Sequence, residues 1–245
     1  MERNVLYIVG IGPGKRDMRT IETDRILSSA EVIAGYSVYN DLVWEDYPRA
    51  EFLTTPMRKE RERCELALGA ASQGKMTALI CSGDAGVYGM AGLALEVGRT
   101  HFPEVEIKVI PGVTAALSGA ALLGAPIGHD FAVISLSDAL TPWELIEQRL
   151  RACAGAGMSI AIYNPESRTR KGYLAKACGI LLELLPEDTV CGIAENIGRE
   201  GEACRVLTLR ELSEETVSMF ATVFIGNRET ADMAGKMVTP RGYRR

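Results

Sequence analysis

The stretch that decides the fold is Val5-Leu6-Tyr7-Ile8-Val9-Gly10-Ile11-Gly12-Pro13-Gly14, close to the start of the chain. Residues 5–11 form an apolar run, and the glycines and the proline after them favour a tight turn. A short apolar run bounded by turn residues is typical of a strand buried within a sheet. The stretch therefore predicts a buried strand that ends in a tight loop.

Short apolar runs and longer helical segments alternate along the rest of the chain. Further strands are expected at residues 32–34, 77–81, 106–110, 131–135, 158–163 and 189–194, and helices at 19–30, 60–73, 87–99, 113–123, 143–151 and 173–185. Two last strands, at 205–209 and 222–225, have only a short helix between them. The alternation predicts an α/β fold with parallel sheets. The break at Gly124-Ala125-Pro126-Ile127-Gly128 predicts two α/β domains, residues 1–124 and 125–245.

Composition limits the classes of protein to consider. The chain has 245 residues, of which 47% are hydrophobic and 24% are charged, so it can bury a substantial core. No apolar run is long enough to span a membrane and no signal peptide is recognisable, so a cytoplasmic protein is expected. The net charge of −5 disfavours a nucleic-acid partner. Six cysteines stand singly beside only two histidines, which predicts no metal site and cysteines that pack as small hydrophobic side chains.

The glycines after the first strand suggest a dinucleotide-binding fingerprint. That fingerprint requires a third glycine three positions after Gly12, where the chain has Lys15. Pro13 also lacks an amide hydrogen that could face a phosphate, and no acidic residue ends the second strand. The sequence therefore disfavours a nicotinamide enzyme. For this motif alone, a purely structural glycine turn is the alternative.

Four other loops follow expected strands, where ligands of parallel α/β folds bind. They are residues 82–89 (Ser-Gly-Asp-Ala-Gly-Val-Tyr-Gly), 111–116 (Pro-Gly-Val-Thr-Ala-Ala), 163–170 (Tyr-Asn-Pro-Glu-Ser-Arg-Thr-Arg) and 195–202 (Glu-Asn-Ile-Gly-Arg-Glu-Gly-Glu). Each loop also has a structural explanation. Asp84 could cap the helix expected from Val87, and the small residues after Pro111 could serve helix packing. Residues 163–170 could be a solvated loop, and residues 195–202 could be a hairpin turn. Taken singly, the segments therefore do not decide whether a ligand binds there.

The order of these motifs is more specific than any one of them. The segments 10–14, 82–88 and 111–115, in this order, resemble the tetrapyrrole (corrin/porphyrin) methylase family, and the resemblance covers nearly the whole chain. One departure is Ala85, where the family more often has proline. Four further segments, residues 35–39, 57–60, 135–143 and 163–168, resemble the branch of the family that methylates carbon 17 of precorrin-3B or cobalt-factor III.

The resemblance carries expectations about fold and cofactor. It implies two α/β domains of the tetrapyrrole methylase type, with the active site in the inter-domain cleft, in a protein that is usually a homodimer. It implies S-adenosylmethionine as the methyl donor, S-adenosylhomocysteine as its product and a tetrapyrrole as the substrate. Where this chain matches the motifs of the family, the resemblance implies cofactor contacts from Pro13, Ser82, Gly83, Asp84, Val87, Thr114, Ala115, Asn164 and Ala194.

The reaction that the resemblance implies is methyl transfer to carbon 17 with contraction of the macrocycle, in cobalamin biosynthesis. Arginines suit the carboxylates of such a substrate, and the candidates are Arg58, Arg168, Arg170 and Arg199. Contraction needs proton transfers, for which the candidates are Tyr36, Glu60, His129, Asp138 and Glu195. A lone histidine such as His129 is more often structural. Methylation of another precorrin carbon and a non-catalytic tetrapyrrole carrier are the alternatives.

Overall fold

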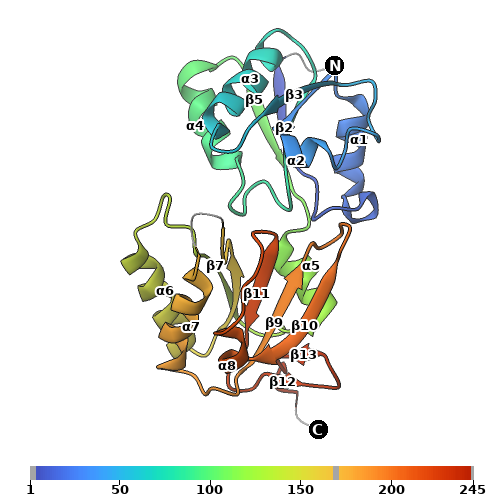
Figure 1. The fold of residues 1–245 in the computed structure, drawn as a ribbon. Helices are drawn as coiled ribbons and strands as arrows, with labels where there is room; N and C mark the ends of the chain where they lie inside the picture. The colour runs from blue at the N-terminus through green and yellow to red at the C-terminus, as the bar shows by residue number, and fades with distance from the viewer. Residues whose placement is uncertain (1–3, 168–170, 244–245) are drawn as a thin grey trace. The chain divides into compact units, whose positions relative to one another are not determined.

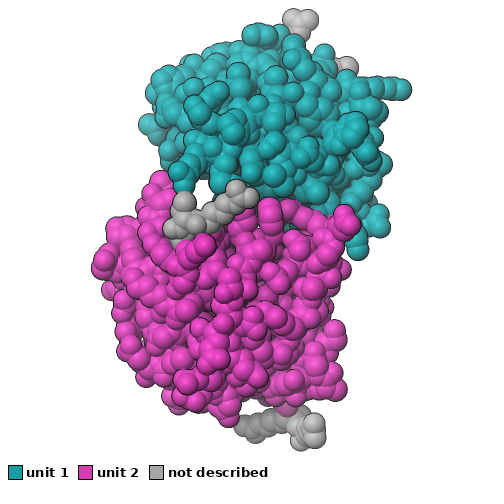
Figure 2. All heavy atoms as spheres, in the orientation of Figure 1, with its two compact units in different colours: residues 1–114 teal, residues 115–245 magenta. Residues whose placement is uncertain are grey.

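The chain divides into two compact units, residues 1–114 and 115–245, which Figure 2 shows in different colours. The structure is a computed structural model that describes residues 4–167 and 171–243. Within those ranges each unit is built around a five-stranded sheet with hydrophobic residues packed on it. No helix in the same ranges is long and apolar enough to cross a membrane.

The first unit contains a fully parallel sheet, as the sequence predicts. Its strands run in the order β3-β2-β4-β1-β5, and each neighbouring pair is parallel. Their bounds are β1 (Val5–Gly10), β2 (Val32–Tyr36), β3 (Glu51–Thr55), β4 (Thr77–Cys81) and β5 (Glu106–Ile110). The sequence did not predict β3, because this edge strand is partly exposed and lacks a continuous apolar run.

Helices cover both faces of this sheet (Figure 1). They are the 3-10 turn η1 (Arg16–Met18), α1 (Ile21–Ser29), α2 (Ser37–Asn40), α3 (Glu60–Ser72) and α4 (Ala91–His101). Leu6 and Ile8 pack with α3 and α4, whereas Val9 packs with α1, because successive side chains of a strand point to opposite faces. The hydroxyl of Thr23, in α1, donates to the carbonyl oxygen of Gly10 at 3.0 Å. This bond fixes α1 to the end of β1.

Helix α4 begins at Ala91 and not at Val87, where the sequence predicted its start. The chain before it cannot be helical, since Tyr88 has a φ of +52°. At Gly89, a Cβ would overlap the carbonyl oxygen of Ala85. The loop after β4 therefore extends to Met90 before the helix starts.

The second unit has a mixed sheet, and the prediction of a parallel sheet was wrong here. Strands β7 and β8 pair in parallel, whereas the pairs β8–β11, β11–β9 and β9–β10 are antiparallel. Residues 196–202, which join β9 to β10, are too few for a crossover, so these two strands form a hairpin. The strands are β7 (Phe131–Ser135), β8 (Ser159–Tyr163), β9 (Val190–Glu195), β10 (Ala203–Thr208) and β11 (Ala221–Ile225).

Helices also lie on both faces of the mixed sheet (Figure 1). One face carries α6 (Trp143–Gly155), α7 (Tyr173–Leu182) and α8 (Leu209–Leu212), and the other carries α5 (Ala115–Leu123), which packs on β9, β10 and β11. A small sheet joins β6 (Gly124–Ala125), β12 (Ala231–Asp232) and β13 (Met237–Val238). Because α5 packs within the second unit, the chain divides at residue 114, ten residues before the predicted boundary at 124.

Most cysteines are buried thiols, as the sequence predicts. Cys64, Cys81, Cys178 and Cys191 are buried, Cys153 is half-buried and Cys204 is exposed. Burial raises the pKa of Cys81 to about 11 and those of Cys64 and Cys178 to about 12. These buried thiols are protonated at neutral pH and pack as small hydrophobic groups, whereas exposed Cys204 departs from the prediction.

Candidate active-site residues

The loops after β1 and β4 are joined backbone to backbone at the carboxyl edge of the parallel sheet. Gly12 N donates to Gly83 O at 3.1 Å, and Gly83 N donates to Gly12 O at 2.7 Å. Both glycines have φ near +70°, which a residue without a Cβ adopts easily. The pairing brings the loop of Pro13 beside the loop of Ser82, two of the predicted cofactor residues.

The loop after β5 reaches the same edge through Gly10 and Gly112. A Cβ on Gly10 would lie 2.6 Å from the nitrogen of Gly112, and a Cβ on Gly112 would overlap the carbonyl oxygen of Gly83. Since both separations are too short for real Cβ contacts, Gly10 and Gly112 must be glycine. The three loops therefore present backbone, and Thr114 follows in the last of them.

Asp84 fastens the loop after β4 to the loop after β5. Its Oδ1 accepts a hydrogen bond from Gly86 N at 2.8 Å, and its Oδ2 accepts one from Gly112 N at 2.9 Å. The alternative that Asp84 caps the next helix is wrong, because the residue at the N-cap of α4 is Met90. A carboxylate has further acceptor lone pairs, so Asp84 can hold both loops and still accept from a ligand.

The ends of β2 and β3 bring further predicted residues to this edge. Tyr36 ends β2 and packs edge-on against Tyr39, with 5.3 Å between ring centroids. Arg58, after β3, has a left-handed φ of +67°, and its backbone N donates to Glu60 Oε1 at 3.2 Å. Such conformations at residues other than glycine cost of order 1 kcal/mol and concentrate at functional sites. Tyr36, Arg58 and Glu60 thus share one edge of the sheet.

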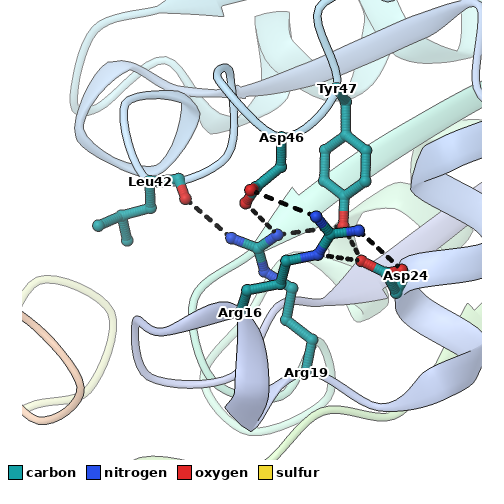
Figure 3. A network of polar contacts seen from close by, with 6 residues as sticks. All are labelled: Arg16, Arg19, Asp24, Leu42, Asp46 and Tyr47. Carbon is teal, nitrogen blue, oxygen red and sulfur yellow. Dashed lines mark hydrogen bonds and ion pairs between the residues drawn. The ribbon is translucent and has the colours of Figure 1, made fainter.

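A polar network lies beside the loop that follows β1 (Figure 3). Buried Arg19 donates to Asp46 at 2.7 Å and to the hydroxyl of Tyr47 at 3.1 Å, and that hydroxyl donates to Asp24 at 2.7 Å. Arg16 binds Asp24 through two nitrogens, which lowers the pKa of that carboxyl. Burial and then the bond to Asp24 raise the pKa of Tyr47 to about 12. The network ties the loop of η1 to residues 41–50.

In the second unit, side chains close the carboxyl ends of β7 and β8. Asn164 has a φ of +51°, and its Nδ2 donates to Ser135 Oγ at 2.9 Å. The hydroxyl of Tyr163 accepts from the backbone nitrogen of Ala116 at 2.7 Å. These bonds join the end of β8 and its loop to the end of β7 and to the first turn of α5.

Asp138 lies in the loop between β7 and α6 and is tied to the start of α7. Its Oδ2 accepts from the hydroxyl of Tyr173 at 2.7 Å. The ring of Tyr173 packs edge-on against Trp143, with centroids 5.1 Å apart, and Lys176 Nζ lies 4.0 Å from the centroid of the Trp143 ring. Asp138 is therefore part of an ordered cluster at the beginning of α6 and α7.

The loop 195–202 is the hairpin between β9 and β10, which was its structural alternative. Within it, Glu195 Oε1 accepts from Ser218 N at 3.4 Å, and the guanidinium of Arg199 lies 5.3 Å from the centroid of the Phe220 ring. Ala194, one residue earlier, is buried within β9.

Of the remaining predicted residues, Val87 lies in the same loop as Asp84, whereas His129 precedes β7 in the second unit. His129 is exposed, and its Nδ1 accepts from Asp130 N at 2.8 Å. Val87 is half-buried in the loop after β4. The predicted substrate residues Arg168 and Arg170 lie outside the described residues.

Sequence reasoning missed Arg63 and Tyr173. Arg63 is buried on the face of α3 that also carries Ala67 and Ala71, one and two turns later. A charge at helical spacing with an apolar face was the available signal. For Tyr173 no local pattern predicts its bond to Asp138, because the two residues are far apart in the sequence.

Comparison with known proteins identifies the family. The sequence profile of the family Tetrapyrrole (Corrin/Porphyrin) Methylases matches residues 5–213. The chain belongs to the tetrapyrrole methylases. Among curated relatives of this methylase, the probable cobalt-factor III C(17)-methyltransferase of Salmonella typhimurium is 44% identical, over 98% of this chain and 99% of the relative. The precorrin-3B C(17)-methyltransferase of a Sinorhizobium species is 39% identical, over 97% of this chain and 96% of the relative.

Solved structures confirm the predicted α/β fold of the tetrapyrrole methylase type. The crystal structure of the methyltransferase CobJ matches with a TM-score of 0.89 and 35% identity, over 98% of this chain and 100% of that one. The uroporphyrin-III C-methyltransferase of Thermus thermophilus, solved with S-adenosyl homocysteine, matches with a TM-score of 0.71 over 92% of this chain and 97% of that one. At 22% identity, this second likeness shows the fold alone.

Proposed function

We propose that this methylase transfers a methyl group from S-adenosylmethionine to carbon 17 of cobalt-factor III or precorrin-3B, with contraction of the macrocycle. The observation that carries the proposal is the meeting of three loops, through Gly10, Gly83 and Gly112, at the carboxyl edge of the parallel sheet. Ligands of parallel α/β folds bind in the loops at this edge. The choice of carbon 17 is supported by identity to two C(17)-methyltransferases over nearly their whole length.

The residues at this edge fit the cofactor. A side chain at Gly10 or Gly112 would push the loops apart, and Asp84 has acceptor lone pairs for a ribose or an amino group. When bound, S-adenosylmethionine supplies an electrophilic methyl group on a positively charged sulfur. The proposed cofactor contacts are Pro13, Ser82, Gly83, Asp84, Val87 and Thr114 in the first unit, and Ala115, Asn164 and Ala194 in the second.

Positioning of the macrocycle and exclusion of water are the main contributions proposed for the protein. A guanidinium donates two parallel hydrogen bonds to a carboxylate, so arginines suit a substrate with acidic side chains. Arg58 is exposed beside the first edge, and Arg199 is already ordered against Phe220. Together with Arg168 and Arg170 they are the proposed substrate contacts.

The contraction step needs groups that hold or move protons, and the proposed set is Tyr36, Glu60, His129, Asp138 and Glu195. Three of these are carboxylates that already accept a hydrogen bond within the fold. Replacing each residue in turn separates the two steps of the reaction. A variant that methylates the substrate but accumulates an uncontracted product identifies the proton carrier.

Product analysis tests the proposal. Cobalt-factor III and precorrin-3B are incubated under anoxic conditions with isotope-labelled S-adenosylmethionine, and the product is examined by mass spectrometry and NMR. Label at carbon 17 of a contracted ring is expected. Label at another carbon would favour the related methylation, and no label in either substrate would contradict a methyltransferase and favour a carrier. For the cofactor site, Asp84→Ala is expected to weaken binding of S-adenosylhomocysteine in calorimetry.

The homodimer that the resemblance implies and the cytoplasmic location that the sequence predicts are also part of the proposal. Light scattering coupled to size-exclusion chromatography tests the dimer, for which twice the chain mass of 26.5 kDa is expected. A single-chain mass across the concentration range would contradict it. Fractionation of cells that express a tagged chain tests the location.

A further inference from the structure

Arg63, in the first turn of α3, is a buried arginine whose charge has no carboxylate partner. Arg63 is only 3% exposed to solvent. Nη2 donates to the carbonyl oxygens of Thr55 at 3.3 Å and Pro56 at 3.0 Å, and Nη1 contacts Met90 Sδ at 3.3 Å. Its Nε has no hydrogen-bond partner. Among the described residues, only neutral groups bind this guanidinium, so no carboxylate is paired with its positive charge.

The Arg19 network of Figure 3 shows how the same unit compensates a buried arginine. Arg19 is 8% exposed, and its Nη1 forms an ion pair with Asp46 at 2.7 Å. Burying a charge without such a partner is costly, and an arginine cannot lose its proton to avoid that cost. Packing alone would be served better by an apolar side chain at position 63. The two carbonyl groups explain a hydrogen-bond donor at this position, whereas the unpaired charge calls for a second explanation.

The groups that Arg63 contacts all lie at the carboxyl edge of the parallel sheet. Thr55 ends β3, Met90 ends the loop after β4, and the ring of Tyr36, whose centroid is 5.8 Å from Arg63 Cζ, ends β2. Arg58, with its left-handed backbone, lies two residues after Pro56, the second of the carbonyl groups that Arg63 holds. The buried charge thus lies beneath the part of the edge that carries Tyr36 and Arg58.

We propose that Arg63 is a positioning residue for an anionic substrate, an inference that rests on the proposed function. It holds the turn that presents Arg58, and its unpaired charge favours a polycarboxylate tetrapyrrole at this edge. Electrostatic attraction inside a protein is screened less than at a free surface, so one buried charge biases binding over several ångströms. The zwitterionic amino acid part of the cofactor gains less from the same field than a ligand with several carboxylates.

The test compares Arg63→Met, which removes the charge, with Arg63→Lys, which keeps it. The matched control is Arg61→Met, because Arg61 lies in the same helical turn but is exposed and paired with Glu65 at 3.0 Å. The probe is uroporphyrin III, a polycarboxylate porphyrin whose binding is followed by fluorescence at low and high salt. Binding of S-adenosylhomocysteine to each variant is measured by calorimetry, and near-UV circular dichroism monitors the fold.

Arg63→Met is expected to weaken porphyrin binding about tenfold at low salt and to reduce its salt dependence, with the affinity for S-adenosylhomocysteine kept within about twofold. Arg63→Lys is expected to keep the wild-type salt dependence, and Arg61→Met to keep both affinities. If Arg63→Met does not fold, the Arg63→Lys variant tests the proposal. Loss of the salt dependence of porphyrin binding in this variant would overturn it.

Two other outcomes would overturn the proposal. Equal weakening in both Arg63 variants with unchanged salt dependence would leave Arg63 a purely structural role and overturn the proposal. A loss of cofactor affinity without a loss of porphyrin affinity would overturn it too. If the wild type binds porphyrin with the expected Arg63 dependence but methylates neither cobalt-factor III nor precorrin-3B, the inference stands and the proposed function fails.

Discussion

In the first unit, backbone closes the carboxyl edge of the sheet, where the loops of Gly10, Gly83 and Gly112 touch. In the second unit, side chains close the ends of β7 and β8, through hydrogen bonds of Ser135, Tyr163 and Asn164. The two edges differ because the strands beneath them differ. In the parallel sheet all five strands end at one edge, where the loops after β4, β1 and β5 meet. In the mixed sheet, β11 and β10 run the other way.

This difference predicts how each edge responds to substitution. An edge of touching backbones has no room for an added atom, so its failure is steric. An edge of hydrogen-bonded side chains fails by losing single bonds, each of which contributes about 1 kcal/mol. The first edge should therefore be the more sensitive of the two to substitution.

Gly112→Ala should be the most damaging substitution. Its Cβ would overlap the carbonyl oxygen of Gly83, so the loops after β4 and β5 must separate. We expect a loss of unfolding free energy of at least about 3 kcal/mol, measured by urea denaturation. The control is Gly69→Ala in α3, where a Cβ meets nothing within 4 Å. This change should stabilise the protein by up to about 1 kcal/mol. Equal effects of the two changes would contradict the steric account.

Asp84→Asn should have the next largest effect. The amide keeps one acceptor oxygen, so either Gly86 N or Gly112 N loses its partner. We expect a loss of about 2 kcal/mol in unfolding free energy, together with weaker binding of S-adenosylhomocysteine. Urea denaturation and calorimetry measure the two quantities. Wild-type values for both would show that Asp84 does not hold the loops.

Tyr47→Phe tests the network that supports the first edge. The change removes the bond to Asp24 and should cost about 1–2 kcal/mol at neutral pH. Because the folded protein raises the pKa of Tyr47 from 10.0 to about 12, it holds the phenol proton more tightly than the unfolded chain does. This contribution to stability is complete below pH 10 and is lost as the pH rises towards 12.

The difference in stability between wild type and Tyr47→Phe should therefore shrink above pH 10. Urea denaturation of both proteins on either side of that pH measures it, and the comparison cancels the titration of groups that both proteins share. A difference that stays constant with pH would contradict the raised pKa.

Asn164→Ala and Asn164→Gly test the side-chain edge. Both changes remove the bond to Ser135, but glycine adopts a φ of +51° without strain, whereas alanine does not. We expect the alanine variant to be about 1 kcal/mol less stable than the glycine variant. Thermal denaturation of the pair measures the gap. If alanine were as stable as glycine, the left-handed conformation at this position would be in doubt.

The reactivity of cysteines towards an alkylating reagent should also differ between the two units. In the first unit, burial raises the pKa values of Cys64 and Cys81, so both thiols should resist iodoacetamide in the folded protein. In the second unit, exposed Cys204 should react first. Mass spectrometry of digested protein after brief treatment identifies the labelled residue. Early label on Cys64 or Cys81 would show that the first core opens more readily than its burial implies.

The sequence by itself determined the parallel half of this protein. Apolar runs such as residues 5–11 and 77–81, each followed by glycines, specified strands, their loops and the edge that carries Asp84, because these signals depend on neighbours in the chain. The order of the glycine motifs was also sufficient to identify the family. Local patterns carry such information because propensity and turn chemistry act over a few residues.

Only the tertiary structure decided the rest. The antiparallel pairing of β11 between β8 and β9 and the bond between Asp138 and Tyr173 both join segments that lie far apart in the sequence. No local pattern encodes such contacts, because they depend on which faces meet once the sheets have formed. For the same reason the sequence placed α5 in the first domain, whereas its packing on β9, β10 and β11 places it in the second unit.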